Sequence, residues 1–293
     1  MSKDYEVIAI DNLHTGSLEN IRHLLGNKQF QFIEQDVTKH INIDVDGIFN
    51  LACPASPVHY QKDPVRTIRT NIMGSLNLLE LATKNRCRII QASTSEVYGD
   101  PLVSPQSEDY WGNVNPIGIR SCYDEGKRVA ETLFFDYHRQ LGTNIGIARI
   151  FNTFGTRMSF DDGRVVSNFI LQSLRGENLT IFGEGLQTRS FCYVSDLASG
   201  LLALFEKPFE TGPINLGNPR ENTILELATI IKRMTSSKSQ VEHFDLPSDD
   251  PRQRKPDITK AMKILDWSPR VSMEEGISKT ILDFTKRLKG ATK

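Results

Sequence analysis

Short apolar runs alternate with longer amphipathic stretches along the first half of the chain. The runs lie at residues 5–10, 30–33, 47–52, 89–90 and 145–150, and they are short and apolar enough to be buried parallel strands. Residues 63–84 carry apolar side chains at helical spacing, and a second helix is expected to reach about residue 141. Strands that alternate with helices in this way predict a doubly wound parallel sheet, the α/β fold of Rossmann type.

The alternation becomes irregular after Gly155. Helices are predicted at residues 165–175, 195–205, 223–234 and 273–288, with short strands at 179–182 and 214–216 and a charged, proline-bounded loop at 249–257. We therefore expect residues 1–155 to form a dinucleotide-binding domain. Residues 156–293 are expected to form mainly a smaller C-terminal α/β substrate domain, with some segments returning to the first.

The composition limits the class of protein but identifies no ligand. The chain has 293 residues, 39% hydrophobic residues and a net charge of −1, so no strong field favours nucleic acid or an anionic membrane. No apolar run approaches about 18 residues, and the N-terminus lacks a basic segment followed by an apolar one, so we expect a cytoplasmic protein. The four cysteines are scattered and the six histidines lack ligand spacing, so no disulfide framework and no metal site is predicted.

Two acidic residues follow predicted strands near the N-terminus. Asp11-Asn12 ends the first strand, where a dinucleotide fold hydrogen-bonds the adenosine ribose, and an acid there favours NAD over NADP. Read alone, Asp11 also fits a loop acid that starts a turn. Asp36-Val37 follows the second strand, near the expected adenine position. After the third strand, prolines force a loop at Cys53, at the edge of the sheet where open α/β proteins bind ligands.

A Gly-rich turn normally admits the pyrophosphate to a helix N-terminus in this fold, and none is found before Tyr5. The pair Gly183 and Gly185 lies far downstream and lacks a third glycine, so it is interpreted as a turn. We expect either that such an element precedes Met1 or that the cofactor site is incomplete.

Tyr123 and Lys127 are the candidate catalytic pair. Four residues are about one helical turn, so the phenol and the ammonium share one face. The ammonium favours phenolate, which lowers the phenol pKa toward that of a base working near neutral pH. The hydroxyl cluster Ser93–Ser95 follows a predicted strand and supplies Thr94. Taken separately, the pair also fits a surface helix contact and the hydroxyls fit a turn; together they form the Ser/Thr–Tyr–Lys set of a short-chain dehydrogenase.

These motifs, in this order, resemble the extended short-chain dehydrogenases/reductases that act on nucleotide sugars, and within them the UDP-glucuronate decarboxylases. The resemblance runs from about residue 6 to about residue 284. Its most specific pieces are ASTSEVYGDP (92–101), SEDYWGNVNPIG (107–118), CYDEGKRVAE (122–131), RIFNTFG (149–155), DGRVVSNFI (162–170) and RKPDI (254–258). The first strand and Gly-rich loop of the family would precede Met1.

The resemblance implies a three-step cycle on one bound NAD. Hydride leaves C4 of UDP-glucuronate for NAD+ while Tyr123 takes the O4 proton and Thr94 holds the oxygen. The 4-keto sugar loses CO2, and hydride returns to C4 to give UDP-xylose. Related 4,6-dehydratases place an Asp directly after the Thr to protonate O6; here that residue is Ser95, a poor acid, and Glu96 is retained near C5 and C6. Without the family, Glu96 also fits a surface acid at a strand end.

The resemblance also implies which residues bind. The cofactor would contact Asp11, Asn12, Asp36, Val37, Leu51, Cys53, Thr70, Tyr123, Lys127, Thr153 and Arg164. The nucleotide sugar would contact Asn77, Tyr137, Asn152, Arg189 and Arg254, with the two arginines on the diphosphate. Without the family, Arg254 also fits a solvated run of charges.

Two rival functions stay open at this point. The first is a UDP-sugar 4-epimerase or 4,6-dehydratase, which requires Ser95 and Glu96 to lie far from C6. The second is a non-catalytic homologue that binds a nucleotide sugar or pairs with an active subunit. By analogy we expect a homodimer through the Tyr123 helix and the helix at residues 63–84.

Overall fold

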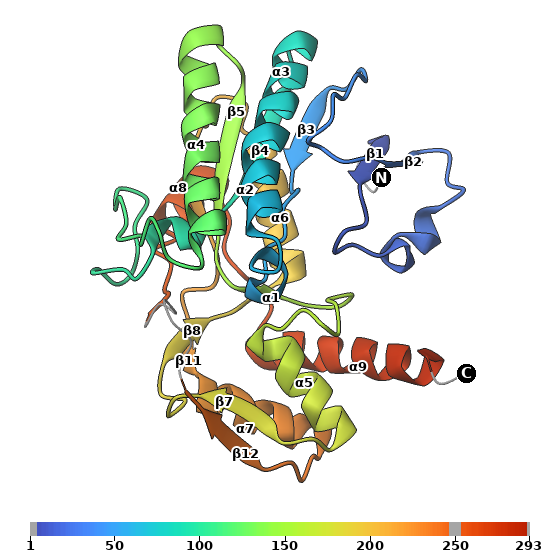
Figure 1. The fold of residues 1–293 in the computed structure, drawn as a ribbon, viewed down its shortest axis with the longest axis vertical. Helices are drawn as coiled ribbons and strands as arrows, with labels where there is room; N and C mark the ends of the chain where they lie inside the picture. The colour runs from blue at the N-terminus through green and yellow to red at the C-terminus, as the bar shows by residue number, and fades with distance from the viewer. Residues whose placement is uncertain (1–4, 246–252, 292–293) are drawn as a thin grey trace.

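A four-stranded parallel sheet forms the centre of the larger part of the molecule. The computed structural model describes residues 5–245 and 253–291 of the chain. The sheet has the order β10-β5-β4-β3, with β3 (Gly47–Asn50), β4 (Arg88–Thr94), β5 (Ile145–Ile150) and β10 (Ile214–Leu216), and every pair in it is parallel (Figure 1). The carboxyl ends of these strands therefore meet at one edge.

Helices cover both faces of this sheet. On one face lie α2 (Pro64–Arg69), a π-helical turn η3 (Thr70–Gly74), α3 (Ser75–Asn85) and α4 (Ser121–Leu141); on the other lie α6 (Val194–Phe205) and α8 (Thr259–Leu265). Successive strand residues point to opposite faces, so Ile89 packs with Leu79 and Phe134 while Ile90 packs with Leu204. This arrangement confirms the predicted doubly wound α/β fold.

The first two strands form a parallel pair of their own. β1 (Val7–Asp11) pairs with β2 (Phe30–Glu34), and two short 3₁₀ turns, η1 (Leu18–Asn20) and η2 (Arg22–Leu24), lie between them in the sequence. In the Rossmann order a strand lies between the positions that β1 and β3 occupy. No strand among residues 5–245 and 253–291 fills that place, so the predicted single sheet is present in two parts.

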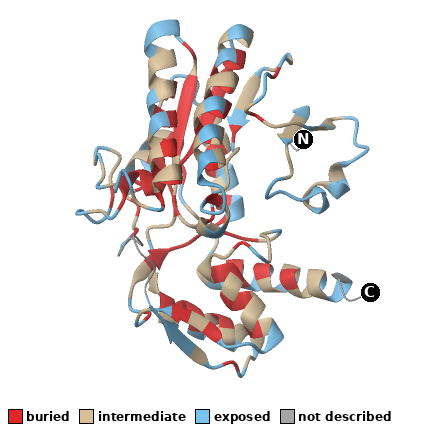
Figure 2. Ribbon diagram, in the orientation of Figure 1, coloured by how far each residue is buried: buried red, intermediate tan, exposed pale blue. Residues whose placement is uncertain are grey.

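A second hydrophobic core lies in the C-terminal half, as the buried residues in Figure 2 show. It is built from α5 (Val165–Arg175), β7 (Leu179–Phe182), α7 (Ile224–Thr235), β12 (Val241–Phe244) and α9 (Met273–Ala291). Phe169, Leu227 and Phe284 are fully buried within it. Residues 192–216 and 258–267 instead pack on the four-stranded sheet, and the division of the chain at residue 155 stays a prediction.

Several short elements of the C-terminal half have no signal in the sequence pattern. β8 (Thr188–Ser190) pairs antiparallel with β11 (Glu221–Thr223), and β6 (Thr153–Phe154) pairs with β9 (Cys192–Tyr193). These strands have two or three residues each, too few to produce a readable alternation. Of the predicted loop at 249–257, residues 249–252 lie outside the described part.

Candidate active site

The carboxyl end of β4 and the first turns of α4 bring the predicted catalytic residues together. Thr94 ends β4 and hydrogen-bonds to Tyr123, and all three side chains of the Thr94–Tyr123–Lys127 set are buried. Lys127 Nζ donates to the Ala92 carbonyl at 2.9 Å and lies 5.8 Å from the centroid of the Tyr123 ring. One strand end and one helix face therefore hold a phenol, a hydroxyl and an ammonium in a single cluster.

Burial has the largest effect on the pKa values of Tyr123 and Lys127. It raises the pKa of the Tyr123 phenol, with a further rise from Cys53, while the hydrogen bond from Thr94 acts in the opposite direction. Burial also lowers the pKa of the Lys127 ammonium. The predicted lowering of the phenol pKa by Lys127 is therefore wrong for the side chains alone, because burial has the largest effect on the pKa of each group and disfavours its charged form. Tyr123 needs a further positive charge nearby to act as a base near neutral pH.

Two neighbours of Tyr123 escaped the sequence analysis. The ring of Tyr60, in α1 (Pro57–Tyr60), stacks on the Tyr123 ring at 4.9 Å between centroids and 5° between planes. Asn71, in the π-helical turn, is buried and hydrogen-bonds to the Cys53 thiol, and its Oδ1 has no partner among residues 5–245 and 253–291. The sequence signal for Asn71 was its position as a polar residue within the otherwise apolar helix face at residues 63–84.

A buried carboxylate with two arginines lies beside the cluster. Glu96, in the 3₁₀ turn η4 (Ser95–Tyr98), accepts from Arg120 Nη2 at 2.9 Å and from Arg254 Nη2 at 2.5 Å, both on Oε2. Burial raises the pKa of Glu96, but Arg254 and Arg120 more than offset this and hold the pKa below its usual range. Glu96 is therefore a charged, buried acid, and its interpretation as a surface acid is wrong.

Arg254 and Arg120 are both buried cations. Only 6% of Arg254 is exposed, so its interpretation as a solvated charge is wrong, and its Nε is buried without a partner in the described part of the chain. Arg120 was missed by the sequence analysis. Its signal was its position three residues before Tyr123, which places it on the same side of the first helical turn. Arg189, on β8, is also buried and lies near enough to Glu96 to lower its pKa.

The buried carboxyl of Asp124 is expected to make the stability of the folded protein depend on pH. Burial, together with the negative charge of Glu96, raises the pKa of its carboxyl to about 8, and Oδ1 has no partner within the described residues. Because the pKa of Asp124 is higher in the native state than in the unfolded state, the native state binds a proton more tightly, and the contribution of Asp124 to stability declines as pH rises from about 4 to about 8.

We expect Asp124→Asn to remove the part of the decline in Tm between pH 5 and pH 8 that Asp124 causes. The exposed variant Asp136→Asn should keep the wild-type slope; equal slopes in all three proteins would contradict the assignment.

The ends of β1 and β2 carry three of the expected cofactor residues. Asn12 Nδ2 donates to Asp36 Oδ2 at 2.8 Å, and Asp11 lies at the end of β1. Burial raises the pKa of Asp36, but hydrogen bonds from Thr38 and Asn12 bring it below its usual range. Two acids and an amide are thus gathered at one strand edge, a suitable place for ribose hydroxyls.

The other expected cofactor residues follow β3 and β5 or lie in the π-helical turn and just before α5. Leu51 and Cys53 follow β3, and Cys53 lies close enough to Lys127 for its pKa to be influenced by it. Thr70 begins the π-helical turn, and its hydroxyl donates to the Arg66 carbonyl. Thr153 and Asn152 follow β5. Arg164 pairs with Asp162 at 2.6 Å and acts electrostatically on Tyr123.

Three expected contacts lie elsewhere. The Val37 side chain is buried in the core with α3. Asn77 Nδ2 donates to the carbonyls of Val37 at 2.8 Å and Lys39 at 3.1 Å, so its amide tethers the segment after β2 to α3. Tyr137 is fourteen residues after Tyr123 on α4, about 21 Å along the helix axis. These three side chains therefore lie away from the Thr94–Tyr123–Lys127 cluster.

The described side chains fit the nucleoside and redox ends of an NAD site. Asp11 and Asp36 lie at strand ends where ribose hydroxyls would bind. The Oδ1 of Asn71 near Cys53, which has no partner in the described part of the chain, is an acceptor that a ligand could use. No Gly-rich turn occurs where a pyrophosphate would need it within residues 5–245 and 253–291. In the same residues no group of three His, Cys, Asp or Glu side chains could hold a metal ion, and none of the helices there has the length and apolar character to cross a membrane.

Comparison with known proteins defines the class. Residues 1–217 match the NAD dependent epimerase/dehydratase family, and the chain belongs to this family. It is 58% identical to UDP-glucuronic acid decarboxylase 5 of Arabidopsis thaliana over 97% of this chain and 83% of that one. It is 52% identical to UDP-glucuronic acid decarboxylase 1 of Danio rerio over 98% and 69%. The fold is similar to the UDP-glucuronic acid 4-epimerase of Bacillus cereus solved with UDP-glucuronic acid and NAD, with a TM-score of 0.88 and 29% identity over 97% of this chain and 92% of that one.

Proposed function

We propose that this chain is an NAD-dependent UDP-glucuronate decarboxylase that produces UDP-xylose and CO2. The observation that carries the proposal is the buried Glu96 with two arginines directly beside the Thr94–Tyr123 pair. Buried guanidinium groups next to a proton acceptor suit a sugar that carries a carboxylate near the hydroxyl to be oxidised. The names of the relatives in Arabidopsis thaliana and Danio rerio support the same activity.

The side chains have separable roles in this reaction. When bound, NAD in its positively charged oxidised form accepts a hydride from C4 and later returns it. Tyr123 takes the proton from O4 as C4 is oxidised and returns it to O4 at the end. Thr94 donates a hydrogen bond to O4 and keeps it beside the phenol. Lys127, held by the Ala92 carbonyl, keeps a positive charge beneath the Tyr123 ring.

Oxidation at C4 makes the carboxyl group labile. The C5–C6 bond breaks, CO2 leaves, and the electron pair moves into the C4 carbonyl as an enolate. C5 then takes one proton from solvent, which is the only proton consumed overall. Ser95 is buried next to Glu96 and is a poor acid, so the elimination of O6 that a dehydratase performs lacks its proton donor.

The binding residues follow from the same placement. We assign Asp11, Asn12 and Asp36 to the adenosine, and Leu51, Cys53, Thr70, Thr153 and Arg164 to the rest of NAD. Arg189 and Arg254 are assigned to the diphosphate, because both are buried guanidinium groups near the sugar end, and Asn152 to the nucleotide sugar. The unpartnered Nε of Arg254 is a donor that a phosphate oxygen would satisfy.

Incubation with UDP-glucuronate and NAD+ tests the proposal. The expected product is UDP-xylose, identified by its mass with one equivalent of CO2. An epimer, which keeps the mass of the substrate, would assign the chain to the 4-epimerases instead. Binding without any product would indicate a non-catalytic homologue.

We further propose a homodimer located in the cytoplasm. Val65, Met73 and Val129 expose 65%, 41% and 38% of their surface on α2, the adjoining π-helical turn and α4, the helices expected to pair. The four cysteines are free thiols, as a reducing compartment keeps them. We expect the double variant Met73→Glu, Val129→Glu to be monomeric by light scattering, while wild type is dimeric. A monomeric wild type would contradict the dimer, and sedimentation of the native protein with a membrane fraction would contradict the location.

A further inference from the structure

Three consecutive residues of β4 bond to three residues of α4. The pairs are Ala92 with Lys127, Ser93 with Glu131 and Thr94 with Tyr123. The three helix residues follow one another at intervals of four, so they share one face of α4. The Thr94–Tyr123 contact is thus one of three adjacent contacts between this strand and this helix.

Glu131 also binds the neighbouring strand β5. Arg149, which lies directly beside Ser93 in the sheet, donates to Glu131 Oε1 from Nε at 3.0 Å and to Oε2 from Nη2 at 2.8 Å. Nη1 of Arg149 donates to the Tyr98 hydroxyl at 3.1 Å and to the Glu108 carbonyl at 3.0 Å, so the guanidinium is itself held in place. One buried carboxylate therefore holds α4 against two adjacent strands.

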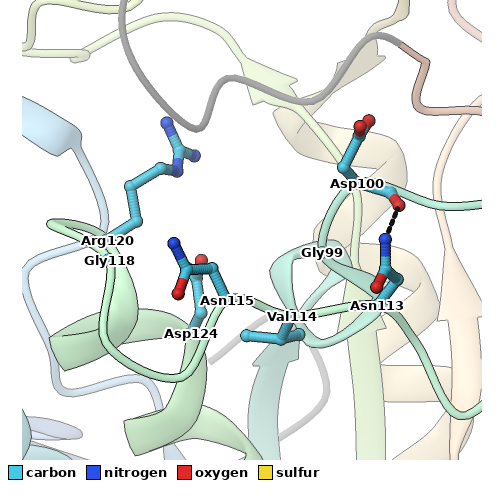
Figure 3. A pocket seen from close by; sticks show the side chains of 8 residues that line it. All are labelled: Gly99, Asp100, Asn113, Val114, Asn115, Gly118, Arg120 and Asp124. Atoms are coloured by element: carbon cyan, nitrogen blue, oxygen red, sulfur yellow. Dashed lines mark hydrogen bonds between the residues drawn. The ribbon is translucent and has the colours of Figure 1, made fainter.

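Glu131 lies away from the reacting groups. It is eight residues after Tyr123, about 12 Å along the helix axis. The residues that border the cavity beside the start of α4 include Gly118, Arg120 and Asp124 (Figure 3). Glu131 does not border this cavity. Any influence of Glu131 on the reaction is therefore indirect.

The Glu131 carboxylate acts on both partners of the Thr94–Tyr123 contact. Thr94 directly follows Ser93 on β4, and Tyr123 lies on the same helix as Glu131. A shift of α4 along the strand would therefore lengthen the hydrogen bond between Thr94 and Tyr123. A misplacement of about 1 Å at a reacting group can lower a rate about 10²-fold.

We propose that Glu131 is a positioning residue that holds Tyr123 beside Thr94. It acts through its bonds to Ser93 and Arg149, which fix the position of α4 along the sheet. The inference rests on the proposed function, in which Tyr123 takes the O4 proton while Thr94 holds O4.

A variant that recovers stability without restoring these bonds tests the role. Glu131→Leu combined with Arg149→Met leaves no buried charge unpaired, so we expect it to be more stable than Glu131→Ala. We nevertheless expect kcat to stay at least about tenfold below wild type, with KM for UDP-glucuronate changed less than twofold, because leucine cannot accept from Ser93. Glu131→Gln should show an intermediate loss of kcat, since glutamine keeps Oε1, the atom that accepts from both Ser93 and Arg149 Nε. The matched control is an exposed ion pair on the same helix: Asp136→Asn with Arg139→Gln should keep the wild-type kcat and KM.

A double-mutant cycle shows whether the effect depends on the Thr94–Tyr123 contact. Ser93→Ala leaves the Glu131–Arg149 pair intact and is expected to lower kcat roughly tenfold. In proteins that carry Thr94→Val, the same change should lower kcat no further, because the contact is already absent.

The distance between the Thr94 and Tyr123 side-chain oxygens gives a test that needs no turnover. In a crystal structure of the Glu131→Leu, Arg149→Met variant, we expect them to lie more than about 3.5 Å apart, beyond hydrogen-bond distance. A retained hydrogen bond, a kcat that recovers with stability, an unchanged kcat in Ser93→Ala, or equal losses from Ser93→Ala in both backgrounds would each contradict the inference. If wild type forms no UDP-xylose, the proposed function fails, while the measured distance still tests this inference.

Discussion

Tyr123→Phe is expected to lower the rate of UDP-xylose formation about 10³-fold, with little change in substrate affinity. The phenol oxygen is the only part removed, and general acid–base groups of this kind contribute roughly 10²–10⁴-fold. The ring that stacks on Tyr60 at 4.9 Å is retained, so the fold should be unaffected. The measurement is kcat and KM for UDP-glucuronate with saturating NAD+, alongside Tm.

Tyr137→Phe is the matched control for this variant. It removes a phenol oxygen from the same helix about 21 Å away. We expect less than a twofold change in rate. A large loss in Tyr137→Phe would restore Tyr137 as a substrate contact, and a Tyr123→Phe enzyme that keeps its rate would remove Tyr123 from the mechanism.

Glu131→Ala is expected to reduce the free energy of unfolding by about 3–5 kcal/mol, the typical loss when one partner of a buried ion pair is removed. Glu131 lies two turns after Tyr123 and accepts from Arg149 Nε at 3.0 Å and Nη2 at 2.8 Å. The Ser93 hydroxyl donates to the same carboxylate. Both charged side chains are only 11–13% exposed, so Arg149 would be left buried without its counter-charge.

Urea denaturation measures this loss, with Glu125→Ala as the control. Glu125 is on the same helix but pairs loosely with Arg128 at 3.6 Å and is about one third exposed. Its removal should cost less than about 1 kcal/mol. The double variant Glu131→Leu, Arg149→Met should recover part of the loss, because it leaves no buried charge unpaired. An unchanged denaturation midpoint in Glu131→Ala would contradict the account.

The features that the sequence predicted have local causes. Tyr123 and Lys127 are one turn apart on a helix whose end at Leu141 the pattern gave correctly. Thr94 meets them because β4 and α4 pack against each other, as strand and helix do in a doubly wound fold. Helix and strand bounds such as Val165–Arg175 and Ile145–Ile150 follow from periodicity alone.

The features that the sequence missed depend on distant pairing. Glu96 joins Arg120 across 24 residues and Arg254 across 158, and no local pattern encodes either contact. Asn77 and Tyr137 were placed by resemblance alone. In the structure Asn77 bonds to the segment after β2, and Tyr137 lies about 21 Å along α4 from Tyr123. The phenol pKa was misjudged because a charge pair seen in sequence says nothing about desolvation.

Conversion of UDP-glucuronate that carries deuterium at C4 tests the central claim most directly, namely that one site oxidises, decarboxylates and reduces the sugar on a single bound cofactor. The account predicts UDP-xylose that keeps the deuterium at C4, with no NADH accumulating during turnover. Product that has lost the label from C4, or labelled product that still carries its carboxylate, would contradict it.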